Sequence, residues 1–184
     1  MRFLRWLRIF IPLLVIAALI AGVIVVLTSR SELQSARRQV NATWGPLRGE
    51  LDKRYTVLEA ANAAAKNVPG PLHLIVAQVD TAAKDWHDLV TNGGSVGAQV
   101  TAANKLEALG RRLVQAARRA PRLQGKTELT TINNYASSEP PRGIAPFEEA
   151  VSRYERERNR PARRLAASIL GYKSVPAYDA SGSA

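Results

Sequence analysis

The chain has 184 residues, no cysteine and a formal net charge of +11, with 26 Lys+Arg against 15 Asp+Glu. The length suits one domain with a core plus an additional segment. The lack of cysteine excludes disulfides and thiolate metal sites. The positive charge favours contact with anionic surfaces such as phospholipid headgroups, cell-wall polyanions or nucleic acid.

The strongest pattern is an uncharged run near the N-terminus, IFIPLLVIAALIAGVIVVL at residues 9–27. As a helix this run would span about 28 Å, close to the ~30 Å hydrocarbon thickness of a bilayer. We therefore predict a transmembrane helix that acts as an uncleaved signal anchor. A cleavable signal peptide is the alternative, but the run exceeds the usual apolar region of ~7–15 residues and no clean cleavage motif follows before Arg30. A buried core helix is disfavoured because every face of the run is apolar.

The residues that flank this run predict its orientation. The membrane flank on the N-terminal side consists of Arg2, Arg5, Trp6 and Arg8. The other flank offers Arg30, partly offset by Glu32. The positive-inside rule therefore places residues 1–8 in the cytoplasm and the C-terminal domain outside it, in a single-pass protein of the cell membrane. Trp6 suits an interfacial anchor.

Beyond the anchor, the apolar residues of the first soluble helix recur at intervals of mostly three, four and seven, which predicts a seam packed against other helices. This seam consists of Leu33, Val40, Trp44, Leu47, Leu51, Leu58, Ala61 and Ala65. Pro46 is expected to kink the helix or to split it near Gly45. The sequence NVPGP at 67–71 then ends it.

Similar spacing predicts three further helices, at about 71–90, 95–120 and 146–160, the last with Phe147, Val151 and Tyr154 facing inward. Residues 127–135 are ambiguous between a short helix and an extended piece. No long strand-like alternation is present. The predicted fold is all-α, with the N-terminal transmembrane helix followed by an antiparallel four-helix-bundle-like domain over residues 28–178 and a flexible tail at 179–184.

The C-terminal region continues past the last long helix. The alternating charges of residues 155–158 are expected to be mainly a solvated, mutually neutralising face. Pro161 interrupts the helix. After it, Leu165, Ile169, Leu170 and Tyr172 are predicted to form a short amphipathic cap, which folds either onto the bundle or onto a membrane surface.

Three stretches resemble the LemA family of membrane-anchored helical proteins. They are RRQVNATWGPLRGELDKRY at 37–55, LGRRLVQAARRAPRLQG at 109–125 and RYERERNRPARRLAASILGYKSVPAY at 153–178. The chain departs from the family pattern at residues 56–59 and at SSEPPRG, so it resembles a divergent member. The resemblance implies one transmembrane helix, a long antiparallel helical bundle outside the cytoplasm and no well-established enzymatic activity.

The sequence offers little for catalysis or for binding a cofactor. His73 and His87 lie about 21 Å apart on one predicted helix, too far to share a metal ion. The glycine-rich TNGGSVG at 91–97 precedes a helix, but it lacks the lysine of a phosphate loop and no strand leads into it. An ordinary turn explains it better. We predict no catalytic residues, no metal and no cofactor.

Basic residues recur along the third predicted helix. Arg111, Gln115, Arg118 and Arg122 are spaced to form one stripe that could face an anionic surface, and a solvated outer face is the alternative. The leading hypothesis is a non-enzymatic membrane protein with an exported interaction domain. Its expected partners are the lipid bilayer, an unknown protein or envelope polymer, and a second copy of the chain, while nucleic acid is disfavoured. The rival hypotheses are a basic cytoplasmic-side module that binds membrane surface or nucleic acid, and a cryptic hydrolase with a cleft of convergent polar groups.

Overall fold

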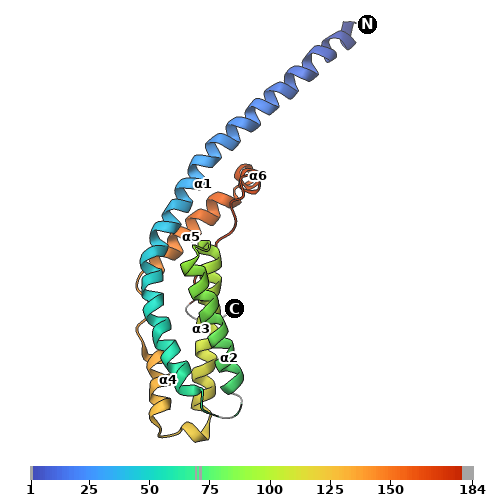
Figure 1. Ribbon diagram of the computed structural model, residues 1–184. Coiled ribbons are helices and arrows are strands. Elements are labelled where there is room, and N and C mark those ends of the chain that lie inside the picture. The colour runs from blue at the N-terminus through green and yellow to red at the C-terminus, as the bar shows by residue number, and fades with distance from the viewer. Residues whose placement is uncertain (1, 69, 71, 180–184) are drawn as a thin grey trace. The chain divides into compact units, whose positions relative to one another are not determined.

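The computed structural model describes residues 2–68, 70 and 72–179, with side chains described from residue 29 onward except at 162. Its helices are α1 (Arg2–Ala65), α2 (Leu72–Thr91), α3 (Val96–Arg118), the short 3-10 helix η1 (Pro121–Leu123), α4 (Thr127–Ser137), α5 (Ile144–Asn159) and α6 (Pro161–Ile169) (Figure 1). This range contains no strand, so the prediction of an all-α fold is confirmed.

The chain divides into two compact units. The first consists of Met1–Gln39 and Ser152–Ser174, and the second of Val40–Val151 and Val175–Ala184. Helices α1 and α5 therefore contribute to both units, while α2, α3 and α4 belong to the second and α6 to the first.

Among the residues whose side chains are described, no helix is long and apolar enough to cross a membrane. The span at 9–27 and its flank of Arg2, Arg5, Trp6 and Arg8 lie outside those residues, although their backbone belongs to α1.

The predicted seam of α1 is confirmed, whereas the helix is not split near Gly45, which was one of the two predicted effects of Pro46. All eight seam residues are buried. The helix continues through Pro46 because this proline lies on the exposed side, where water can bond the Ala42 carbonyl that the proline leaves without an N–H donor. Trp44 and Leu47 on the opposite side are buried, so packing holds the helix on both sides of the proline.

In the second unit, polar contacts set the directions of the helices that pack on α1. The indole Nε1 of Trp44 donates to Oε1 of Gln99 at 2.6 Å, and the Tyr55 hydroxyl donates to the Ala103 carbonyl at 3.1 Å. Residue numbers thus rise together along α1 and α3, so this part of α1 runs in the same direction as α3.

Helix α2 runs the opposite way. Trp86 Nε1 donates to Asp52 Oδ1 at 2.9 Å, whereas Asn62 Nδ2 donates to Asp80 Oδ1 at 2.8 Å. After α2 the chain reverses direction into α3, and the two helices lie side by side (Figure 1). The glycine-rich segment is the turn between them. Gly93 has a positive φ of 67°, which permits this turn.

Aromatic side chains occupy the core of the second unit. The ring centroids of Trp44 and Trp86 lie 6.3 Å apart, those of Trp44 and Phe147 lie 5.1 Å apart, and those of Tyr55 and Trp86 lie 5.2 Å apart. Such aromatic pairs each stabilise a fold by about 0.5–1.5 kcal/mol beyond the burial of their area. This cluster joins α1, α2 and α5 within the unit.

The ambiguous segment at 127–135 is a helix, α4, and it packs on α3. Only Ile132 and Tyr135 of α4 are buried, and threonines occupy positions 127, 130 and 131. Threonine has a weak helix propensity, so the local pattern gives no clear preference. The contacts of the two buried side chains decide the outcome.

In the first unit, the predicted short helix after Pro161 is present as α6, and its larger apolar side chains do not pack on the described part of the chain. Ala166 and Ala167 are the buried residues of α6, whereas Leu165 and Ile169 are 73% and 74% exposed. Small alanine side chains allow α6 to pack closely, which turns the larger side chains outward. On α5, which contributes to both units, the inward positions of Phe147, Val151 and Tyr154 are confirmed.

Candidate functional site

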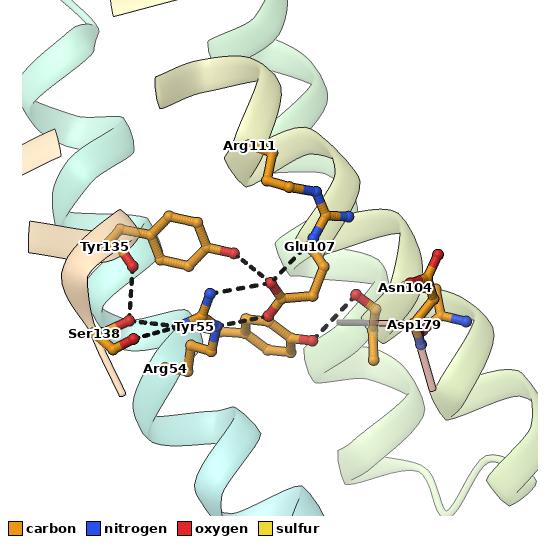
Figure 2. Close-up of polar contacts among 9 residues, drawn as sticks. Arg54, Tyr55, Asn104, Glu107, Arg111, Tyr135, Ser138 and Asp179 are labelled. Carbon is orange, nitrogen blue, oxygen red and sulfur yellow. Dashed lines mark hydrogen bonds and ion pairs between the residues drawn. The ribbon is translucent and has the colours of Figure 1, made fainter. Parts of the chain in front are cut away.

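The second unit buries a carboxylate in its interior. Glu107 on α3 is only 1% exposed. Arg54 on α1 binds it with two hydrogen bonds, from Nε to Oε1 at 2.8 Å and from Nη2 to Oε2 at 3.2 Å. Such a bidentate pair is the strongest form of this ionic contact. Figure 2 shows the carboxylate of Glu107 between groups from three helices.

Helix α4 completes this polar cluster, which we define as Arg54, Glu107, Arg111, Tyr135 and Ser138. The Tyr135 hydroxyl donates to Oε2 of Glu107 at 2.9 Å, and Arg111 Nη1 lies 3.9 Å from the same oxygen. Arg54 also donates to the side chain of Ser138, and its guanidinium carbon lies 4.5 Å from the centre of the Tyr135 ring (Figure 2). The cluster therefore ties α1, α3 and α4 together.

The chain segment after α6 returns to this cluster. Val175 and Tyr178 are buried, and Asn104 on α3 holds the backbone on both sides of Tyr178. Its Nδ2 donates to the Ala177 carbonyl at 3.0 Å, and its Oδ1 accepts from the Asp179 N–H at 2.9 Å. Residues 175–179 therefore pack on the second unit. Asp179, predicted to begin a flexible tail, is held by this bond, and residues 180–184 lie outside the described range.

Burial and the Glu107 charge shift the pKa of the groups around the carboxylate. Burial raises the pKa of both Tyr135 and Tyr178 above the usual value, and the negative charge of Glu107 adds to this effect. Burial alone would lower the pKa of Arg54, but its hydrogen bonds to Glu107 outweigh this and raise it. At neutral pH the phenols are therefore protonated and Arg54 carries its charge.

These raised pKa values predict alkaline unfolding. The unfolded state releases its tyrosine protons near pH 10, while the folded state holds them, so the free energy of unfolding falls as the pH rises above about 10. A Tyr178→Phe variant should make this fall shallower, because position 178 then no longer ionises on unfolding. Phenylalanine keeps the buried aromatic ring of Tyr178 and removes only its ionisable hydroxyl. Urea unfolding measured at several pH values between 8 and 12, with absorbance at 295 nm to follow tyrosine ionisation, tests this. An equally steep fall in the variant would contradict it.

The sequence prediction missed Glu107, although a signal for it was present. Buried residues of α3 occur at 100, 103, 107, 110, 114 and 117, at alternating intervals of three and four. A carboxylate on such a row must find a partner, because an unpaired buried charge is strongly destabilising. Its oxygens bond Arg54 and Tyr135, so the cluster acts as a structural joint and leaves the carboxylate closed to a substrate.

The predicted basic stripe is not a single helical row. Arg111 is part of the polar cluster, and Arg118 Nε donates to Asn133 Oδ1 on α4 at 2.9 Å. Pro121 begins η1 after α3 has ended, so Arg122 lies on η1 and not on α3. Gln115 is exposed. The structure therefore separates the four residues into different environments.

A cleft of about 690 Å³ lies where the loop after α1 meets the end of α3. Its apolar walls include Val68, Leu72, Ala116 and Pro121, and its charged residues are Arg119 and Arg122. Both arginines are exposed, and neither forms an ion pair with a described residue. The arrangement suits a carboxylate or phosphate group attached to an apolar moiety.

Both histidines lie on α2 as predicted, and His87 Nε2 lies 2.8 Å from Glu59 Oε1 at the surface. Within the described part of the chain, no group of three His, Cys, Asp or Glu side chains could hold a metal ion. Comparisons with protein families, with curated proteins and with solved structures find no match to this chain.

Proposed function

We propose that this chain is a single-pass membrane protein whose helical domain acts outside the cytoplasm as a non-enzymatic interaction module. Residues 9–27 form the signal anchor, residues 1–8 stay in the cytoplasm, and residues 28–178 form an antiparallel four-helix-bundle-like domain. This architecture is the one implied by the resemblance to the LemA family. The partners are the bilayer and a protein or envelope polymer that carries anionic groups.

One observation carries the proposal: α1 is an unbroken helix from Arg2 to Ala65. The uncharged run at 9–27 therefore continues, without a flexible linker, into the buried seam that starts at Leu33. A helix of this kind would connect the anchor to the domain with no loop between them. The run of nineteen uncharged residues has the length that a bilayer requires.

The contacts in the second unit favour binding over catalysis. The carboxylate of Glu107 is hydrogen-bonded to Arg54 and Tyr135, and its side chain is buried. The cleft, by contrast, offers Arg119 and Arg122 beside apolar walls, which supports the binding of an anionic group. A cytoplasmic-side module that binds lipid headgroups or nucleic acid is the second candidate, and the same exposed arginines favour it.

The side of the membrane on which the domain lies separates these candidates. The chain has no cysteine, so one introduced at Leu74, which is 70% exposed, is its single thiol. We expect a membrane-impermeant maleimide to label Leu74→Cys in intact cells. An Arg2→Cys variant serves as the reciprocal control and should react only after permeabilisation. The reverse pattern would reject the exported domain and favour the cytoplasmic-side module.

A further inference from the structure

The surface of α6 carries two large apolar side chains that no described part of the chain covers. Leu165 and Ile169 lie four residues apart, on the same face of the helix, and are 73% and 74% exposed. The opposite face packs through Ala166 and Ala167. Basic residues border the exposed face, with Arg160, Arg164 and Lys173 all exposed. An apolar face bordered by arginine and lysine is typical of helices that lie in a membrane interface.

An ion pair fixes where α6 lies along α1. Arg163 on α6 pairs with Glu32 on α1, and both belong to the first unit. Glu32 is five residues beyond the end of the uncharged run, a rise of about 7.5 Å in a helix. The headgroup region on one side of a bilayer is about 5–8 Å thick. If the run spans the membrane, α6 lies at the height of the lipid headgroups.

The segment on each side of α6 is fixed to the same unit. Tyr154 donates to the Lys173 carbonyl at 2.8 Å, and Arg158 Nε donates to the Tyr172 carbonyl at 3.1 Å. The guanidinium carbon of Arg37 lies 5.7 Å from the centre of the Tyr172 ring. In Figure 1, α6 is seen nearly end-on while the first part of α1 extends across the picture, so the axis of α6 crosses that of α1. A helix that crosses the anchor lies along the membrane plane.

We propose that α6 is a membrane-interface helix whose Leu165 and Ile169 insert into the outer edge of the bilayer that holds residues 9–27. The inference rests on the proposed membrane anchor. The lipid bilayer is the partner because the Arg163–Glu32 pair holds α6 beside the end of the anchor. The bordering cations match anionic headgroups. Insertion would restrict the tilt of α1 by giving the domain a second point of membrane contact.

Site-directed spin labelling of the full chain in vesicles of phosphatidylcholine and phosphatidylglycerol tests this inference. Single cysteines replace Leu165, Ile169, the equally exposed control Leu74 on α2, and Ile16 within the anchor. We expect the ratio of collisions with oxygen to collisions with a water-soluble nickel complex to be several-fold higher at 165 and 169 than at 74. The ratio at 16 should be higher still.

The outcomes separate the inference from the proposal on which it rests. The label at 16 could be in lipid while the labels at 165 and 169 are as accessible to the nickel complex as the label at 74. This result would overturn the interface helix and leave the anchor intact. A label at 16 that is accessible to the nickel complex would overturn the proposed anchor, and the interface helix with it. Dipolar broadening between labels at 165 would show that a second copy covers this face, and would also overturn the inference.

A variant series adds an independent check. In Leu165→Gln/Ile169→Gln, a label on Ser168→Cys, which lies on the same exposed face, should lose its lipid contact, whereas Leu74→Gln should leave that contact unchanged. Because Leu165, Ile169 and Leu74 are exposed, these substitutions leave the packed residues in place, and circular dichroism confirms the fold. Unchanged lipid contact in the double variant would contradict the proposed role of the two side chains.

Discussion

The Glu107→Gln variant is expected to unfold with a free energy about 3 kcal/mol lower than that of the native chain. The substituted glutamine keeps the shape of the side chain and still accepts a hydrogen bond from Tyr135, but it carries no charge to balance Arg54. The guanidinium of Arg54 lies in a side chain that is only 15% exposed, so water cannot replace the lost partner. Urea unfolding of the detergent-solubilised chain, followed by tryptophan fluorescence, measures the loss.

A double variant distinguishes a lost ion pair from general disruption of the core. In Arg54→Met/Glu107→Gln the uncompensated charge is gone, so the destabilisation should be smaller than the sum of the two single losses by at least about 1 kcal/mol. The exposed pair Arg142–Glu139, with side chains 83% and 86% exposed, supplies the control. Arg142→Gln should leave the unfolding midpoint unchanged, because surface pairs contribute little. If the stability losses of the two single variants simply added in the double variant, this would contradict the proposed ion pair between Arg54 and Glu107.

Gly110→Ala is expected to destabilise the chain by about 1–2 kcal/mol, although alanine normally stabilises a helix relative to glycine. A Cβ at this position of α3 would lie 2.5 Å from Cε1 and 2.6 Å from the hydroxyl oxygen of Tyr135. Tyr135 cannot move aside easily, because it is 1% exposed and its hydroxyl is bonded to Glu107. Thermal unfolding monitored by circular dichroism gives the sign and size of the effect.

The control for this substitution is Gly49→Ala on α1. Apart from its chain neighbours and the backbone of the adjoining helical turns, no atom lies within 4 Å of a Cβ built there, so alanine should raise the free energy of unfolding by about 0.5–1 kcal/mol. The two glycines are both helical, and their opposite expected signs come from packing alone. In a Tyr135→Leu background, Gly110→Ala should lower the free energy of unfolding by less, because the aromatic ring is absent. An equal gain in stability at both glycines would show that Tyr135 does not pack on Gly110 as described.

The apolar periodicity along α1 could be predicted because a helix repeats every 3.6 residues, so buried positions recur at fixed intervals. The rule that a proline breaks a helix interior failed at Pro46. The effect of a proline depends on whether the carbonyl that loses its N–H donor faces water or the core, and only the packed structure decides this. The sequence left the environment of Leu165 and Ile169 open for a related reason, because spacing identifies a shared face without showing what covers it.

The polar cluster could be predicted only in part. The row of α3 that contains Glu107 is visible in the sequence, but its partner Arg54 lies 53 positions earlier, and Tyr135 lies 28 positions later. No local pattern links positions so far apart. The same holds for Tyr178, which reaches the second unit only because the chain returns after α6.

The sequence by itself determined the all-α class, the core seam of α1 and the uncharged run of anchor length, because these depend on residue type and on regular spacing. Only the tertiary structure decided which charged and apolar side chains are buried and which partners they contact. It buried Glu107 against Arg54, separated Arg111, Arg118 and Arg122 into different environments, and left the apolar face of α6 exposed. The physical reason is that the energy of a charge or an apolar surface depends on what lies next to it, and distant parts of the chain supply those neighbours.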